Sequence, residues 1–434
     1  MKQKRNILSI VNSIYKHFFG VDMSRDVREF LNNLGWSFFG GGISAAVFFG
    51  SFLFLGRIFG PALYGQFTVL YALTLFGTNF AVLGYDSGYI KFAALLEERF
   101  QKEVFFRRLV LRSGFILLVM SGLFCLLRLK GMFLEVPLFL ILATIIIFTL
   151  KAFVDALLRE RNLFQVQQFA RIAEAVSLVC ILGGIFLSQN VTLSSVLSAY
   201  MLTSLIFVLV GFLLSRKGHV FSGLGKEEQV FWQGHKGAVI EYSTLLYING
   251  LIGYAYSYGD KLFFSQYVDD FLLGQYSAYY MLSVMLFSQA TILFINVFFP
   301  VIVQRSLTRN LKDRIERIFL RGVFILVIPF TLFIYFAISL LGKAYTQDII
   351  LSLLFSLLTF INVYFLLIWW QIASVGNKGV RFMIRTGILS LIIFFGVFYV
   401  LISVYQLPAL IIALSLSLLY NIIQGRIFLA KNIL

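Results

Sequence analysis

The 434-residue sequence predicts an all-α integral membrane protein with about twelve transmembrane helices in two six-helix bundles, and with both termini in the cytoplasm. Three observations carry this prediction. The composition is 60% hydrophobic and 13% charged, whereas about 25% of the residues of soluble proteins are charged. Apolar runs long enough to cross a bilayer, which takes about 20 residues each, recur from Leu34 to the C-terminus. The cationic residues gather on one side of the alternation that these runs define.

The apolar runs also divide the chain into domains. The longest polar stretch between them, SRKGHVFSGLGKEEQVFWQGHKGA (215–238), is expected to be a cytoplasmic linker between a first bundle, 34–214, and a second bundle, 239–434. Residues 1–33 are expected to form a cytoplasmic arm, in which the pattern of apolar and basic residues over 4–19 predicts an amphipathic helix on the membrane surface. The expected transmembrane helices are 34–56, 62–84, 109–129, 133–155, 169–188, 193–214, 239–259, 271–299, 318–341, 349–375, 382–404 and 408–429.

The distribution of cations tests this assignment. With a cytoplasmic N-terminus, 31 of the 36 Lys and Arg residues fall on the cytoplasmic side, and a missed helix would destroy that bias. The net charge of +16 is then explained by the positive-inside rule and needs no nucleic-acid partner. The five exceptions, on the outer side, are Arg57, Arg128, Lys130, Lys261 and Lys343.

A repeated motif relates the two halves. Two helices, expected to be the second of each bundle, open with Gly-Gln followed by an aromatic residue and a hydroxyl residue. Six helices per half is an even number, so the halves would insert with the same orientation and form parallel repeats that can rock about a shared interface. In register, Gly65, Gln66, Phe67, Thr68, Tyr71, Leu73 and Thr74 match Gly274, Gln275, Tyr276, Ser277, Tyr280, Leu282 and Ser283.

Three segments resemble the Wzx-type polysaccharide flippases of the multidrug/oligosaccharidyl-lipid/polysaccharide exporter superfamily. They are LGRIFGPALYGQFTVLYALTLFGTNFAVLGYDSGYIKF (55–92), FVDALLRERNLFQVQQFARIAEAVSLV (153–179) and GDKLFFSQYVDDFLLGQYSAYYMLSVMLF (259–287). The resemblance implies a MATE-like pair of bundles around a central, often cationic cavity. It also implies transport of undecaprenyl-diphosphate-linked oligosaccharides to the outer leaflet of the bacterial cytoplasmic (inner) membrane, for O-antigen, capsule or exopolysaccharide synthesis.

Ionisable residues near bilayer depth are candidates for function, because an unpaired charge there costs several kcal/mol. Arg57 and Lys261 are unusual cations on the outer side and end equivalent helices, so they are the first candidates. Most of the other charges lie at expected helix ends, where snorkelling to the headgroups is an alternative explanation. The candidates for a cationic cavity that binds diphosphate are Arg57, Lys261, Arg112, Lys91 and Arg385. The candidates for ion coupling or ion pairing are Asp86, Asp260, Glu241 and Asp155.

Other chemistries have little support in the sequence. The segment GLGKEE lacks the first glycine and the hydroxyl residue of a phosphate-binding loop, so we expect a secondary-type transporter without ATPase activity. The three histidines have no metal-ligand spacing, and Cys125 and Cys180 each stand alone in an apolar run. No metal and no cofactor is expected, while coupling to H+ or another ion stays open.

The expected partners are a lipid-linked oligosaccharide, membrane lipids and, by resemblance, a polysaccharide polymerase and chain-length machinery. Two alternatives remain. A multidrug or organic-cation exporter of the same superfamily would place carboxylates in its cavity. A membrane-embedded glycosyl or acyl transferase would need paired carboxylates or a histidine at a membrane face. The lipid II flippases are similar in chemistry but resemble fourteen-span proteins.

Overall fold

The computed structural model describes residues 25–93, 96, 99–129, 136–215, 226–292, 309–373, 375 and 377–432, and these residues contain helices and no strand. The predicted helix over 4–19 and Lys130 lie outside them. The first half comprises α2 (Arg25–Val82), α3 (Tyr85–Ala93), α4 (Arg99–Leu129), α5 (Leu138–Glu160), α6 (Phe164–Leu187) and α7 (Leu193–Ser215). The second half comprises α8 (Lys226–Tyr254), η1 (Ala255–Gly259), α9 (Asp260–Phe264), α10 (Asp270–Tyr280), η2 (Met281–Met285), α12 (Arg309–Ile338), η3 (Ser339–Leu341), α13 (Ile349–Ala373), α14 (Asn377–Tyr405) and α15 (Leu407–Asn432).

The helix α2 is a hairpin of two helices. Gly60 has φ 67° and ψ 176°, which is outside the helical region, and Pro61 starts the next helix. The rings of Phe52 and Tyr71 lie 5.4 Å apart between centroids, whereas one straight helix would separate these residues by roughly 28 Å. The chain therefore reverses at Gly60, between the predicted helices 34–56 and 62–84.

Each of the twelve predicted transmembrane segments overlaps helical residues in the described part of the chain, and parts of 133–155 and 271–299 lie outside that part. Seven described helices are long and apolar enough to cross a membrane, by length and composition, and one of them is the double segment Phe39–Val82. Segments such as α4 and α12 begin with several charged residues, and α10 is followed directly by the π-helical η2. The exact number of crossings and the side on which the termini lie stay predictions.

The helix α8 begins earlier than the sequence predicts. The sequence predicts a linker over 215–238 and a helix from residue 239, but α8 already starts at Lys226. Its first turns are polar and contain no proline, so the helix can continue past the apolar run that bilayer thickness selects. The boundaries of the two bundles stay predictions.

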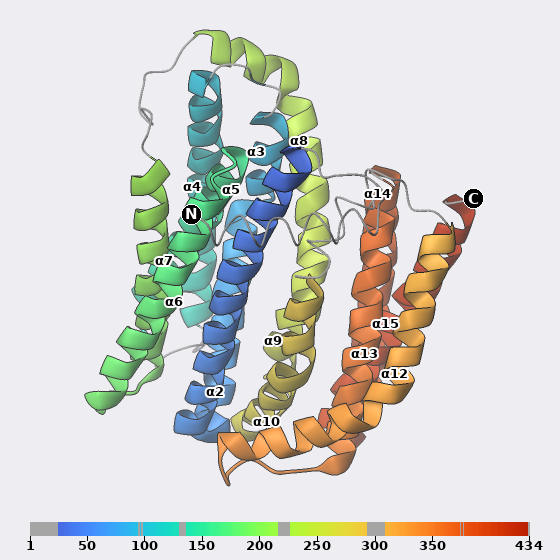
Figure 1. Cartoon of the computed structure of the whole chain (residues 1–434). Helices are drawn as coiled ribbons and strands as arrows, with labels where there is room; N and C mark the ends of the chain where they lie inside the picture. The colour runs from blue at the N-terminus through green and yellow to red at the C-terminus, as the bar shows by residue number, and fades with distance from the viewer. Residues whose placement is uncertain are drawn as a thin grey trace, which may run out of the picture.

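The two halves meet along the repeated motif. Figure 1 shows α2–α7 on one side of the molecule and α12–α15 on the other, with α8–α10 between them. The second part of α2 packs on α10, and the equivalent residues Thr68 and Ser277 contact each other with hydroxyl oxygens 2.9 Å apart. Contact between equivalent residues is expected where two halves related by a twofold axis meet close to that axis. The Gln66 amide donates to the Asp270 carboxylate at 2.8 Å, so the halves are joined at the Gly60 end of the bundle.

Two motif glycines permit this close approach. A Cβ atom at Gly274 would overlap the carbonyl oxygen of Pro61, and a Cβ atom at Gly65 would overlap that of Asp270. Gly274→Ala is therefore expected to lower stability by about 1–3 kcal/mol, because the added methyl group forces the helices apart. Gly396→Ala, whose Cβ would meet no atom within 4 Å, is the control and should not lower the melting temperature. Thermal unfolding in detergent compares the two, and equal melting temperatures would contradict the close packing.

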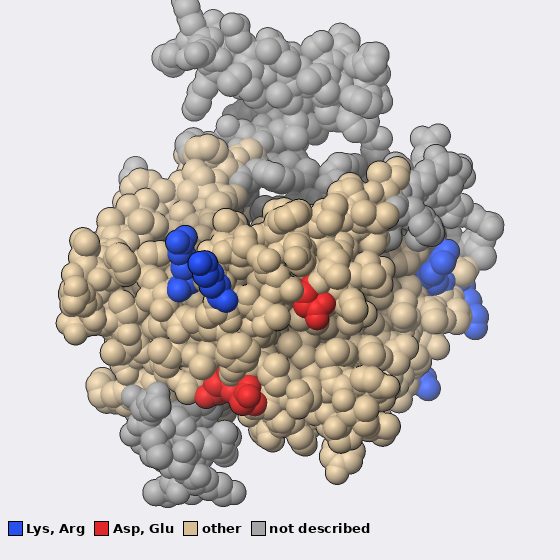
Figure 2. Space-filling view, turned by 90° about the horizontal axis from the view of Figure 1, so that it is seen from below, with Lys and Arg blue, Asp and Glu red and all other residues tan. Residues whose placement is uncertain are grey.

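Charged side chains are sparse at the Gly60 end. Figure 2 looks onto this end of the bundle and shows a largely uncharged surface with a few separate Lys, Arg, Asp and Glu side chains. That this end faces the outer side of the membrane stays a prediction.

Candidate functional site: a central cavity between the halves

Two adjoining cavities lie between the halves. The charged cavity has a volume of about 740 Å³ and is lined mainly by α2, α5, α6 and residues 285–290, with Lys151, Asp155, Arg171 and Glu174 as its charged residues. The tyrosine cavity has a volume of about 170 Å³ and is lined mainly by α2, η1, α10, η2, α13 and α15. The two share the lining residues Phe52, Tyr71, Tyr258, Met285 and Gln289, so they are parts of one space.

The charged cavity contains two ion pairs between α5 and α6. Lys151 and Asp155 lie one turn apart on α5, and Arg171 and Glu174 lie one turn apart on α6. Arg171 pairs with Asp155 at 3.2 Å, and Lys151 pairs with Glu174. The side chains of Lys151 and Arg171 are 30% and 31% exposed, so both cations face open volume.

The two carboxylates are held by further partners. The Gln167 amide donates to Asp155 at 2.7 Å, and Arg159 forms a second ion pair with Asp155. The Ser204 hydroxyl donates to Glu174 at 3.0 Å. Asp155 therefore keeps a cation and an amide donor if Arg171 is engaged by another anion, whereas the buried Glu174 depends on Lys151 for its charge balance.

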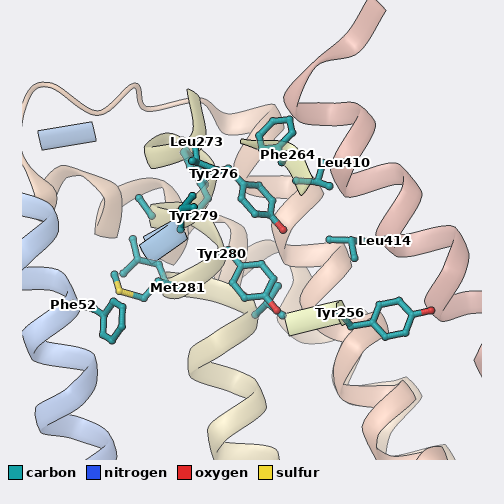
Figure 3. Packing of buried hydrophobic residues seen from close by; sticks show 14 of the residues in the cluster. Phe52, Tyr256, Phe264, Leu273, Tyr276, Tyr279, Tyr280, Met281, Leu410 and Leu414 are labelled. Carbon is teal, nitrogen blue, oxygen red and sulfur yellow. The ribbon is translucent and has the colours of Figure 1, made fainter. Parts of the chain in front are cut away.

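The tyrosine cavity surrounds Lys261. Its ammonium nitrogen lies 3.8 Å from the centroid of the Tyr280 ring and 5.5 Å from that of Tyr276. Figure 3 shows Tyr276 and Tyr280 stacked along their helix, with Tyr256 on one side and Met281 and Phe52 on the other. Both repeats therefore contribute aromatic side chains to this space.

Lys261 is fully engaged within the protein. Its ammonium group donates to both carboxylate oxygens of Asp260, each at 3.3 Å, and to the carbonyl oxygen of Ser257 at 3.1 Å. The Tyr276 hydroxyl also donates to Asp260. An ammonium group has three N–H donors, so Lys261 has none left for a ligand. Asp260 and Lys261 form a buried, internally satisfied pair.

Four other predicted diphosphate ligands lie elsewhere. Arg57, Lys91 and Arg385 are exposed, and none of them lines either cavity. Lys91 lies over the Tyr242 ring at 3.7 Å. Arg112 is half-buried and lines a separate groove of about 430 Å³ beside Arg108 and Tyr85.

Arg57 and Lys261 differ because the two hairpins turn differently. Arg57 lies less than one helical turn before Gly60, where the chain reverses at once. Lys261 lies three residues before the end of α9 at Phe264, and five further residues, 265–269, connect α9 to α10. Lys261 is therefore deep between the halves, while Arg57 is at the end of the bundle.

The coupling candidates also divide. Asp155 lines the charged cavity and Asp260 is buried beside the tyrosine cavity, each in an ion pair. Glu241 is exposed and pairs with Arg381 at 3.2 Å. Asp86 follows the candidate span Phe39–Val82. Its pKa is raised above the ordinary value, because the effect of burial exceeds the opposing effect of the Arg159 charge.

Lys151, Arg171 and Glu174 are also charges near expected helix ends, but they are not among the residues selected as diphosphate or coupling candidates. A signal for them exists in the sequence. Two consecutive apolar helices each carry two opposite charges one turn apart, an arrangement that lets the helices form two ion pairs with each other. Of the tyrosines at the cavity junction, Tyr71 belongs to the repeated motif, whereas nothing distinguishes Tyr258 in a chain that is 17% aromatic.

Comparison with known proteins places this geometry in context. The model of the family described as polysaccharide biosynthesis protein matches residues 30–306. No curated protein sequence matches the chain significantly. A multidrug resistance MATE family transporter of the MOP superfamily, in an inward-facing conformation, has a TM-score of 0.61 at 12% identity and covers 89% of this chain and 95% of its own. The lipid II flippase MurJ, in an inward closed conformation, has a TM-score of 0.58 at 14% identity and covers 92% of this chain and 87% of its own. These similarities establish the fold.

Proposed function

Because the chain belongs to the polysaccharide biosynthesis protein family, we propose that it is a flippase that moves undecaprenyl-diphosphate-linked oligosaccharide units from the inner to the outer leaflet of the bacterial cytoplasmic membrane. The observation that carries the proposal is the charged cavity, in which Lys151 and Arg171 are partly exposed between two halves of a transporter fold. A diphosphate is the anionic group common to such substrates.

The diphosphate binds between Lys151 and Arg171. Arginine binds phosphate through paired hydrogen bonds, and lysine contributes a mobile point charge. Arg171 can turn toward the ligand at low cost, because Asp155 keeps Arg159 and Gln167. Glu174 is buried and would keep only the Ser204 hydroxyl among its partners in the described part of the chain, so Lys151 binds the diphosphate while it stays paired with Glu174. The polyprenyl chain stays in the lipid, since each CH₂ group withdrawn from it would cost about 0.8 kcal/mol.

The halves then rock about the contact between α2 and α10. The cavity opens toward one membrane face while the motif closes the other, and the substrate is released when the closed end separates. An inside-negative potential favours outward movement of an anion by about 2.3 kcal/mol per charge per 100 mV. Counterflow of H+ or another ion through Asp155 or Glu174 would add to this drive.

A multidrug exporter is the second candidate. Asp155 and Glu174 line the charged cavity, and carboxylates beside aromatic rings suit lipophilic cations. Against it, both carboxylates are already paired with cations, which repel a cationic drug. Deletion of the gene separates the two functions: loss of surface polysaccharide with unchanged drug tolerance supports the flippase, and drug sensitivity with intact polysaccharide supports the exporter.

Arg171→Gln tests the flippase proposal directly. We expect flipping to fall about tenfold to a hundredfold, because charge-assisted hydrogen bonds to the diphosphate are lost. The fold should survive, since Asp155 keeps Arg159 and Gln167. The assay uses proteoliposomes with a short-chain polyprenyl-diphosphate glycan and measures its exposure to an impermeant glycosidase.

The matched control is Arg107→Gln, which removes an exposed arginine of α4. It should leave flipping unchanged. Equal rates for wild type, Arg171→Gln and Arg107→Gln would remove Arg171 from the substrate path, and a wild-type protein that flips no glycan of this class would end the proposal.

A further inference from the structure

We propose that the tyrosine cavity, with the Tyr71 and Tyr258 hydroxyls at its mouth, is a saccharide subsite for an uncharged pyranose ring next to the diphosphate. This inference rests on the proposed function. It names the chemistry of the first sugar, which the charged cavity by itself does not specify.

The electrostatics of the tyrosine cavity favour a neutral ligand. Lys261 is the one charged residue among the described residues that line it, and its three donors are used by Asp260 and Ser257. The positive charge is balanced by a buried carboxylate. A uronic acid or a second phosphate would therefore enter this space without a cation to bind it, and would lose its hydration.

The lining matches a pyranose ring in shape and polarity. A pyranose has apolar C–H faces and a rim of hydroxyl groups, which suit aromatic ring faces and phenolic hydroxyls respectively. The Tyr71 ring is fixed by the Phe67 ring at 5.9 Å and the Tyr200 ring at 5.3 Å. In the described part of the chain, the Tyr71 and Tyr258 hydroxyls and the Gln289 amide form no hydrogen bond with other residues. These polar groups therefore remain available to sugar hydroxyls.

The position of these tyrosines selects the first sugar. Tyr71 comes from α2 and Tyr258 from η1, and both line the charged cavity as well as the tyrosine cavity. A sugar that extends from a diphosphate in the charged cavity into the tyrosine cavity passes this shared lining. Because the two hydroxyls come from different halves, a ring that bonds both of them also bridges the halves.

The test compares three soluble probes: farnesyl diphosphate, the same diphosphate carrying glucose, and the same diphosphate carrying glucuronic acid. Their dissociation constants are measured on the full-length protein in a detergent without a sugar headgroup. Wild-type protein is expected to bind the glucosyl probe about tenfold more tightly than the glucuronyl probe. Tyr71→Phe/Tyr258→Phe, which keeps both rings, should weaken the glucosyl probe about tenfold and leave farnesyl diphosphate unchanged. Tyr399→Phe, at an exposed position of α14, is the control and should change neither.

The outcomes separate the two proposals. Arg171→Gln should weaken all three probes, since each carries the diphosphate. If wild-type protein binds farnesyl diphosphate but the tyrosine variant binds every probe as tightly as wild type does, or glucuronic acid is preferred, the saccharide subsite is wrong and the diphosphate site stands. If wild-type protein binds none of the probes, both proposals fail.

Discussion

Oxidised protein carrying Thr68→Cys and Ser277→Cys is expected to lose nearly all transport, and reduction should restore it. The two hydroxyl oxygens are 2.9 Å apart, so sulfur atoms at the same positions need only a small shift to form a 2.05 Å bond. The bond would join α2 to α10 at the Gly60 end of the bundle. Transport requires the halves to separate there, and a covalent bond prevents that separation.

The experiment needs a background without Cys125 and Cys180, the two native cysteines. Each single-cysteine variant is the control and should transport equally well with and without oxidant. Flipping in proteoliposomes is measured before oxidation, after oxidation and after reduction of the same sample. Full activity of the cross-linked protein would mean that this contact does not open, and rocking of the two halves would be the wrong mechanism.

Asp260→Leu is expected to destabilise the protein by about 3–5 kcal/mol. The substitution leaves the Lys261 ammonium buried, with the Ser257 carbonyl as its remaining hydrogen-bond acceptor among the described residues, and removes the acceptor of the Tyr276 hydroxyl. Loss of the monodisperse peak in size-exclusion chromatography and a lower melting temperature are the measurements.

Asp260→Leu/Lys261→Met should recover most of this loss. The double variant removes both charges together, and a buried ion pair replaced by apolar residues of similar volume is often close to neutral in stability. Transport should recover as well if Lys261 is occupied by Asp260 and Ser257. A stable double variant that cannot flip substrate would instead make Lys261 a ligand of the diphosphate, as the sequence first suggested.

Much of the fold could be predicted because its signals are local. Apolar runs of bilayer length become helices since a lipid environment leaves no other partner for the backbone. The Gly60-Pro61 pair marks a chain reversal for reasons that lie within a few residues. The start of α8 was harder to predict from the sequence. Its first turns are polar and show no hydrophobic periodicity, so the sequence does not distinguish them from a loop.

The structure separates the predicted site residues, and their roles stay predictions. Asp155 and Lys261 line the central cavity and Asp260 is buried beside it, but Arg57, which the same argument favoured, lies outside it. The connection between the helices is about one turn longer in the second half than in the first. Lys261 therefore lies in the interior, whereas Arg57 lies at the rim. The sequence reading treated Arg57 and Lys261 as equivalent because both end a helix.

By itself the sequence determined a helical membrane protein with a duplicated motif and few charges within its apolar segments. These properties follow from composition and spacing, and the bilayer enforces them along each helix separately. Only the tertiary structure decided which charges meet. The cost of burying Lys151, Arg171 or Lys261 depends on a carboxylate and on the neighbouring packing, and for the first two that carboxylate comes from another helix. Such a cation can bind a ligand only if its carboxylate partner leaves some of its N–H donors free. If the partner uses all of them, the pair is structural.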